Sequence, residues 1–143
     1  MFKVQPLRSQ EVQQELAASL GVKYYENTYS FFAVDMDEEG TKILSIIGLC
    51  QFEYAPDGAI IKSIAAAPDK KGDEAVFIMV RTVMNFCYRA ELPTIAIELS
   101  DDQNDLASDS AFVKSLGFRE KSGYVIDLKQ FYKSPCHYNG KEN

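Results

Sequence analysis

The chain has 143 residues, of which 46% are hydrophobic and 25% charged, and its formal net charge is −6. This length and mixture are typical of one globular domain and exclude a disordered or fibrous chain. Because the lysines and arginines are scattered, and the longest apolar run (75–80) is far too short to span a bilayer, we expect no nucleic-acid partner and no membrane partner.

The first half of the chain predicts a helix followed by a long hairpin. Ser9 can cap the helix. The apolar residues of this helix share one face by their spacing: Val12, Leu16 and Leu20. Residues 29–34 and 43–54 are rich in aromatic and β-branched side chains, and the acidic turn at 37–40 joins them into a hairpin.

The middle of the chain predicts the centre of a sheet. Residues 59–66 form a strand rich in Ile and Ala, Pro68 ends it, and a helix follows over 74–90. With a further strand at 94–99, the order strand, helix, strand indicates parallel pairing through a right-handed crossover. The large apolar side chains of the helix should make it the main contributor to the core: Val76, Phe77, Ile78, Met79, Val80, Val83, Met84 and Phe86.

The last third of the chain predicts one more helix and two closing strands. An apolar helix ends at Gly117, and strands follow at 118–121 and 124–128. We therefore expect one domain over 1–133 and a flexible tail over 134–143.

The three cysteines, Cys50, Cys87 and Cys136, are odd in number and widely spaced. That spacing fits reduced thiols better than a disulfide framework or a zinc site, so we expect no metal and a cytoplasmic protein. Cys136 and His137 are neighbours, but a pair in a flexible tail is poorly fixed for nucleophilic catalysis. The acidic run at 101–105 is not followed by the glycine and glutamate that a calcium loop needs.

Three segments form a recognisable pattern: the strand ending IAAAP at 64–68, the loop KKGDE at 70–74 with its long helix, and SAFVKSLGF at 110–118. Together they resemble the GNAT superfamily of acyl-CoA-dependent N-acetyltransferases, and the order of elements resembles it over nearly the whole chain. The resemblance implies an α/β (α+β) fold with a mixed, mostly antiparallel sheet, a central parallel pair that splays apart, and flanking helices. It also implies transfer of an acyl group from acyl-CoA to an amine of a small molecule or peptide.

In that family the pantetheine of CoA lies in the gap between the splayed strands. The loop before the long helix binds the pyrophosphate through backbone N–H groups that glycines leave accessible. The resemblance therefore implies that CoA or acetyl-CoA contacts the following residues: Ile64, Ala65, Ala66, Lys70, Lys71, Gly72, Asp73 and Ala75.

The pyrophosphate loop departs from the family pattern. Counted from Pro68, Lys71 holds the basic position, but Glu74 and Val76 stand where the pattern has Gly and then Gly or Ala. A shift of one residue restores only the last position, with Ala75. In either alignment acidic side chains stand where phosphate would bind, and they can cap the helix themselves.

The sequence identifies the catalytic residues less clearly than the cofactor loop. The reaction needs a base to take a proton from the amine, and Glu53 on the hairpin and Glu98 at a strand end are the candidates. Glutamates in such positions also commonly face solvent or pair with a lysine. The family's tyrosine acid falls on Val113, which cannot donate a proton. Tyr54 and Tyr124 are possible substitutes, although tyrosines in strands most often pack on the sheet.

Two other roles fit the same residues. With the glycines and the tyrosine absent, the fold can serve as a noncatalytic binding or assembly module, and affinity for CoA distinguishes that module from an enzyme. A homodimer is a further possibility, because Phe31, Phe32, Phe131, Tyr132 and Tyr138 are aromatic side chains that a partner surface can cover.

Overall fold

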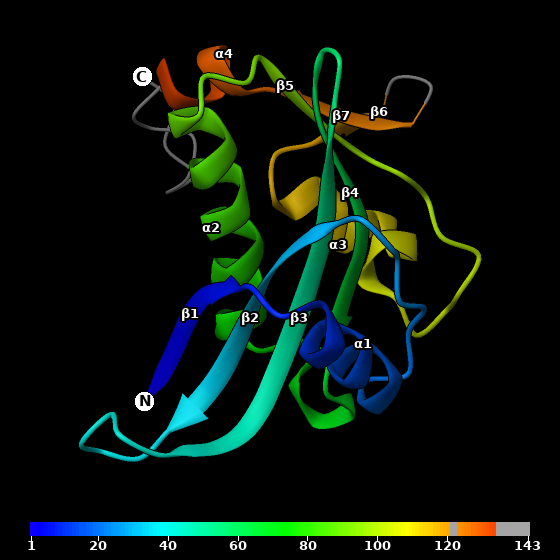
Figure 1. Ribbon diagram of the computed structural model, residues 1–143. Coiled ribbons are helices and arrows are strands. Elements are labelled where there is room, and N and C mark those ends of the chain that lie inside the picture. Colours follow the sequence, from blue (N-terminus) through cyan, green and yellow to red (C-terminus); the bar gives the residue numbers. More distant parts are fainter. Residues whose placement is uncertain (121–122, 134–143) are drawn as a thin grey trace.

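The computed structural model describes residues 1–120 and 123–133, and its centre is one seven-stranded sheet (Figure 1). The strands lie in the order β1-β2-β3-β4-β5-β7-β6, and every neighbouring pair is antiparallel except β4 and β5. The strands are β1 (Phe2–Leu7), β2 (Tyr29–Met36), β3 (Ile43–Ala55), β4 (Gly58–Ala66), β5 (Thr94–Ile97), β6 (Arg119–Glu120) and β7 (Tyr124–Asp127). The helices are α1 (Gln10–Ser19), α2 (Glu74–Arg89), α3 (Ser110–Ser115) and α4 (Leu128–Lys133), with 3₁₀ turns η1 (Pro68–Lys70) and η2 (Leu106–Ser108). This arrangement confirms the predicted mixed, mostly antiparallel sheet with a parallel central pair.

The two faces of the sheet carry separate apolar clusters. Along β2, Phe31 and Ala33 belong to the large cluster that includes α2, whereas Phe32 and Val34 belong to a smaller cluster with α1. Successive side chains of a strand point to opposite faces, so α2 and α1 cover the two sides of the sheet. Phe31 and Phe32 are only 6% and 8% exposed. The prediction that this pair offers a dimer surface is therefore wrong, because both rings fill the core.

Helix α1 has a different buried face from the one predicted. Ser9 caps it as expected, because its Oγ accepts the Val12 N–H at 3.2 Å. Val12 is nevertheless 39% exposed, and the buried residues of the helix are Gln13 and Ala17. An amide side chain thus takes a place that hydrophobic spacing assigns to an apolar residue.

Helix α2 contributes more buried residues to the core than any other helix, as predicted, but its buried stripe is narrower. Phe77 and Ile78 are half-buried, and Phe86 is 40% exposed. The Phe86 ring leans on the edge of the core, 5.4 Å from the Phe31 ring centre and 6.1 Å from that of Phe52. The fully buried residues of the helix are Ala75, Val76, Met79, Val80, Val83, Met84 and Cys87.

Helix α4 is absent from the sequence prediction. The strand expected over 124–128 ends at Asp127, and Leu128 begins the helix. Its contact with α2 includes stacked rings of Tyr88 and Tyr132, whose centres lie 4.3 Å apart. The strand expected over 94–99 is also shorter, because β5 ends at Ile97.

Some predictions fall outside the described residues. They are the tail at 134–143 with the Cys136–His137 pair and Tyr138, and Lys121 of the strand expected at 118–121. Within the part of the chain that the structure describes, no helix is long and apolar enough to cross a membrane.

Candidate functional site

The candidate site lies where the parallel strands part. β4 and β5 pair from Gly58 with Thr94 to Ile61 with Ile97, and their pairing then stops while β4 continues to Ala66. We call this point the fork. Figure 1 shows β4 and β5 in the middle of the sheet, between β3 and β7. The sequence thus folds into the splayed pair that its order of elements predicts.

A β-bulge at the fork turns two neighbouring side chains to one face. The pairing of β3 with β4 passes from Gln51 opposite Ser63 to Phe52 opposite Ile61, so Lys62 is the extra residue. Residues 61 and 64, an odd number apart, both belong to the cluster under α2. Lys62 and Ser63 are therefore left together on the face of α1, which a regular strand would not allow.

Lys62 forms the central ion pair of the site. Its Nζ lies 3.0 Å from Glu98 Oε1 and 3.1 Å from Oε2, and its side chain is only 16% exposed. The hydrogen bond to Glu98 raises the pKa of Lys62 above its ordinary value. The Tyr25 ring, from the loop between α1 and β2, covers the ammonium with its centre 5.6 Å from Nζ. The ammonium is thus held in a fixed place at the fork.

A cavity of about 420 Å³ opens beside Lys62. Its lining residues come from the α1–β2 loop, β3 and β4: Lys23, Tyr24, Tyr25, Glu26, Glu53 and Lys62. Of the two predicted bases, Glu98 from the end of β5 pairs with Lys62, and Glu53 from β3 lines the cavity together with Lys62. Within residues 1–120 and 123–133 the Glu53 carboxylate forms no ion pair, so it is the freer of the two.

Beyond the fork an internal carboxylate occupies the space between the strands. Asp105 is 2% exposed and accepts hydrogen bonds from Ser63 Oγ at 2.5 Å, the Ile64 N–H at 2.8 Å and the Ala107 N–H at 2.9 Å. Burial raises the pKa of Asp105, although these hydrogen bonds act in the opposite direction. Ile64, a predicted cofactor contact, thus already donates its backbone N–H. Like Ala65 and Ala66, it is at most 2% exposed.

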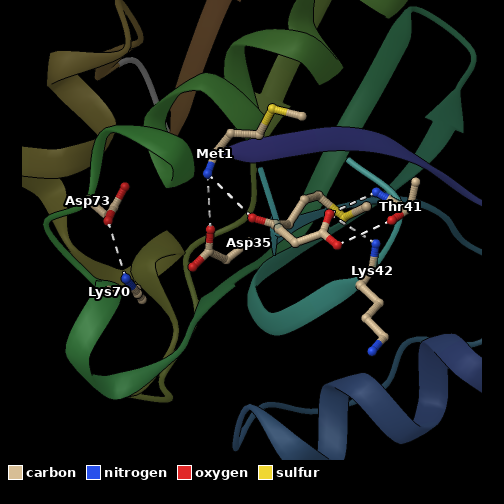
Figure 2. Close-up of polar contacts among 8 residues, drawn as sticks. Met1, Asp35, Thr41, Lys42, Lys70 and Asp73 are labelled. Atoms are coloured by element: carbon tan, nitrogen blue, oxygen red, sulfur yellow. Dashed lines mark hydrogen bonds and ion pairs between the residues drawn. The ribbon is translucent and has the colours of Figure 1, made fainter. Parts of the chain in front are cut away.

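In the loop before α2, backbone N–H groups are likewise already bonded to acceptors of this chain. Asp73 caps the helix by accepting the Ala75 N–H at 2.8 Å, and Lys70 Nζ lies 3.9 Å from Asp73 Oδ2 (Figure 2). The backbone N–H groups of Lys70, Asp73 and Val76 donate to carbonyl groups of the same segment. An added Cβ at Gly72 would meet no atom within 4 Å, so nothing in this loop requires that glycine.

The other sequence candidates do not line the cavity, although Tyr124 on β7 pairs with Ile97 beside the fork. Val113 is fully buried, and Tyr124 is 4% exposed, so neither side chain is free to reach a ligand. Tyr54 is 43% exposed, but its ring packs on Tyr29 and Phe52. Since Tyr54 and Glu53 are neighbours on β3, they point to opposite faces. The structure thus brings no predicted tyrosine to the cavity and adds Tyr25, which the sequence did not indicate.

The described residues hold no cluster suited to a metal ion, meaning no group of three or more His, Cys, Asp or Glu side chains. Cys50 and Cys87 are free and buried thiols. Burial raises the pKa of Cys87 to about 12 and that of Cys50 well above its ordinary value. Both therefore stay protonated and behave as small apolar side chains.

Comparison with known proteins shows the fold. A structure described as a "putative acetyltransferase of the GNAT family" from Desulfovibrio desulfuricans superposes with a TM-score of 0.68 at 12% identity, covering 90% of this chain and 99% of that one. The ribosomal-protein-S18-alanine N-acetyltransferase of Escherichia coli gives 0.60 at 15% identity, covering 90% and 94%. A chain of the NatC complex bound to Gag peptide and CoA gives 0.62 at 14% identity, covering 88% and 98%.

Sequence comparison adds less. No family model matches the chain. A probable thymidylate kinase of Methanobrevibacter smithii is 22% identical over 100 residues, which is 70% of this chain, and the chain spans about half (48%) of that relative. The structural comparisons therefore carry the conclusion, which is that the chain has the GNAT fold.

Proposed function

We propose that this GNAT-fold chain transfers an acyl group from acyl-CoA to an amine held in the cavity beside Lys62. One observation carries the proposal: the bulge places Lys62, which is paired with Glu98, in the wall of a cavity of about 420 Å³ that Glu53 also lines. The acetyltransferases of the same fold, one of them solved with a peptide and CoA, support it. Small-molecule amines and peptide amines both remain acceptor classes to be tested.

The reaction gives one role to Glu53 and another to Lys62. Acyl-CoA supplies a thioester whose carbon bonds to the amine nitrogen as the carbon–sulfur bond breaks. Glu53, which has no ion-pair partner among the described residues, is the base that takes the proton from the amine. Lys62 keeps its charge because its pKa is raised, and it offers that charge to the negative oxygen that forms at the acyl carbon. Since Val113 cannot donate, the departing thiolate takes its proton from water.

The donor is proposed to lie along the far part of β4 and the loop before α2. The acyl end would lie beside Ile64, Ala65 and Ala66, which is where β4 no longer pairs with β5. The phosphates would lie at residues 70–75, where Lys70 and Lys71 offer positive charge near the amino terminus of α2. This placement requires Asp105 to leave the Ile64 N–H, since one amide hydrogen cannot serve both.

The test is an acylation assay. The purified chain, acetyl-CoA and a panel of amines that includes amino acids, polyamines and peptides are incubated, and mass spectrometry detects an acylated amine. Glu53→Gln should lower kcat by about 10²- to 10⁴-fold, the usual contribution of a general base. Glu120→Gln, an exposed glutamate on the edge strand β6, serves as the control. Absence of any product across the panel would contradict the proposal.

A second candidate function is a noncatalytic module with the same fold, and two contacts favour it. Asp105 holds the Ile64 N–H and Asp73 holds the Ala75 N–H, so the chain's own carboxylates occupy groups that a CoA site would use. Calorimetric titration with CoA separates the two functions. Micromolar affinity supports the enzyme, and no binding at millimolar CoA supports the module. Sedimentation in the same buffer tests whether such a module forms the homodimer expected from the sequence.

A further inference from the structure

Two glutamines lie fully buried behind the cavity. Gln13 on α1 and Gln51 on β3 are both 0% exposed, and Gln13 Nε2 donates to Gln51 Oε1 at 2.9 Å. Gln13 Oε1 in turn accepts the hydroxyl of Ser30 on β2 at 3.1 Å. A buried amide is costly unless its donors and acceptors are satisfied, and a satisfied network fixes one geometry. The network thus ties α1 to two strands of the sheet.

The same network reaches the loop between α1 and β2. Gln51 Oε1 accepts the Tyr25 N–H at 2.9 Å, and Gln51 Nε2 donates to the Lys23 carbonyl at 2.9 Å. Gln13 Nε2 also donates to Thr28 Oγ1 at 2.7 Å, and that hydroxyl donates to the Tyr25 carbonyl at 2.7 Å. Both backbone polar groups of Tyr25 are therefore held by side chains of the network, either directly or through Thr28.

This loop is a wall of the cavity. Lys23, Tyr25 and Glu26 line it opposite Glu53 and Lys62. The Tyr25 ring centre lies 5.0 Å from Lys23 Nζ and 5.6 Å from Lys62 Nζ, so its place sets where both ammonium groups can lie. Residues 23–26 lie outside the helices and strands, and the side chains that bond their backbone are Gln51 and Thr28, the latter held by Gln13.

We infer that Gln51, together with Gln13, is a positioning residue that pre-forms the amine-binding wall of the cavity. It holds Tyr25 over Lys62 before a substrate arrives, so that binding does not have to order the loop. The inference rests on the proposed function for the identity of the occupant, an amine. Its consequence is selective: loss of the Gln51 amide should weaken amine binding and leave the acyl donor unaffected. Among the described residues, no side-chain hydrogen bond of the network reaches the donor positions at 64–66 or the loop before α2.

The kinetic test compares Gln51→Leu with Cys50→Ala. Cys50 is the preceding residue on β3, equally buried, and faces the α2 cluster instead of the loop. Gln51→Leu should raise the KM for the amine about tenfold or more, as expected when a reacting group is displaced by a change outside the site. In Gln51→Leu the KM for acetyl-CoA should stay within about twofold of the wild-type value. In Cys50→Ala both KM values should stay within about twofold of the wild type. Equal changes in both KM values for Gln51→Leu would overturn the inference.

A spectroscopic test needs no turnover and so separates this inference from the proposed function. In the wild type the ε-methylene resonances of Lys62 should be shifted upfield by the ring current of Tyr25, and the Tyr25 amide should exchange slowly. Both signatures should vanish in Gln51→Leu and persist in Cys50→Ala. If Gln51→Leu does not fold, Thr28→Val removes the Gln13–Thr28–Tyr25 connection with little change in shape. The ring-current shift of Lys62 should then be lost, while Gln51 still accepts the Tyr25 N–H. Retention of both signatures in a folded variant would refute the positioning role, whether or not the wild type acylates an amine.

Discussion

Lys62 and Glu98 pair at the last point where β4 and β5 are still joined. The Glu98 N–H donates to the Ile61 carbonyl at 3.1 Å, and its carboxylate lies 3.0 Å from Lys62 Nζ. A main-chain bond and an ion pair therefore close the paired part of the two strands together. Beyond these two contacts β4 no longer pairs with β5, and Asp105 bonds to β4 there instead. The cavity lies beside Lys62 at the same point.

A double-mutant cycle with Lys62→Met and Glu98→Gln should give a favourable coupling free energy of about 1 kcal/mol or less, because Glu98 is half exposed. The pair raises the pKa of Lys62, so its contribution is full below the ordinary value of 10.5 and is lost as pH rises through the raised folded value. Urea unfolding should show the coupling at about pH 8 and lose it as the pH rises through the raised pKa of Lys62. A coupling that persists at the alkaline end would assign it to packing instead.

Asp105 should make stability depend on pH in the acid range. Burial raises its pKa above the ordinary 3.8, so the folded state binds the proton more tightly than the unfolded chain. That contribution is full below 3.8 and is lost as pH rises through the folded pKa. Asp105→Asn is neutral throughout and lacks this dependence. The free energy of unfolding of the wild type, relative to Asp105→Asn, should therefore be larger at about pH 4 than at about pH 7. Urea titration at the two pH values measures it, and an equal difference would contradict the assigned cause.

Replacement of Glu74 should strengthen CoA binding. Glu74 is exposed at the first turn of α2, and a carboxylate about 5 Å from a phosphate costs about 3 kcal/mol at an effective dielectric of about 20, less when water screens it. We expect Glu74→Ala to gain up to about tenfold in affinity, whereas Glu120→Ala, with the same charge change on β6, should gain little. Calorimetry decides between them. Equal gains in both variants would indicate only that the chain has become less negative. The proposed placement of the phosphates at residues 70–75 would then be contradicted.

Met79→Asp should unfold the protein. Met79 is fully buried in the α2 cluster, and a carboxylate there has no partner to offset its desolvation, a penalty of several kcal/mol against a total stability of about 5–15 kcal/mol. Asn85→Asp, on the exposed side of the same helix, adds the same charge and should leave the melting temperature nearly unchanged. Circular dichroism on heating compares the two variants. A cooperative transition in Met79→Asp at the wild-type temperature would mean that the buried face is misassigned.

The sequence predicted the order of elements well because each strand and helix carries its own local signal. It failed where a distant partner decides burial. Val12 was expected on the buried face of α1, yet Gln13 is the residue that is buried, because it bonds to Gln51, which is 38 residues away. No count of apolar residues within α1 contains that information. Phe86 differs for a related reason, since it covers the edge of the core and not its centre.

For the site, the sequence indicated the two glutamates but not Lys62. Lys62 reaches the cavity only because β4 has a bulge, and the composition of a strand rich in Ile and Ala does not reveal a bulge. Asp105 was considered only as part of the acidic run at 101–105, although its carboxylate is buried against β4. Its neighbour Leu106 marks where that run turns inward, which is the one local signal that was available.

The pairing of β4 with β5 starts at Gly58, which has a φ of +153° and stands so close to Thr94 that a Cβ would overlap the Thr94 carbonyl oxygen. Only glycine can occupy that position, so Gly58 fixes the residue at which the pairing of β4 with β5 begins. Four residues of pairing later the strands separate, and the next residue is Lys62. A residue inserted or deleted between 58 and 62 would turn Lys62 toward the other face of the sheet and remove its ammonium from the cavity. Changes of length in the turn at 56–57 precede Gly58, so they would leave the number of residues between Gly58 and Lys62 unchanged.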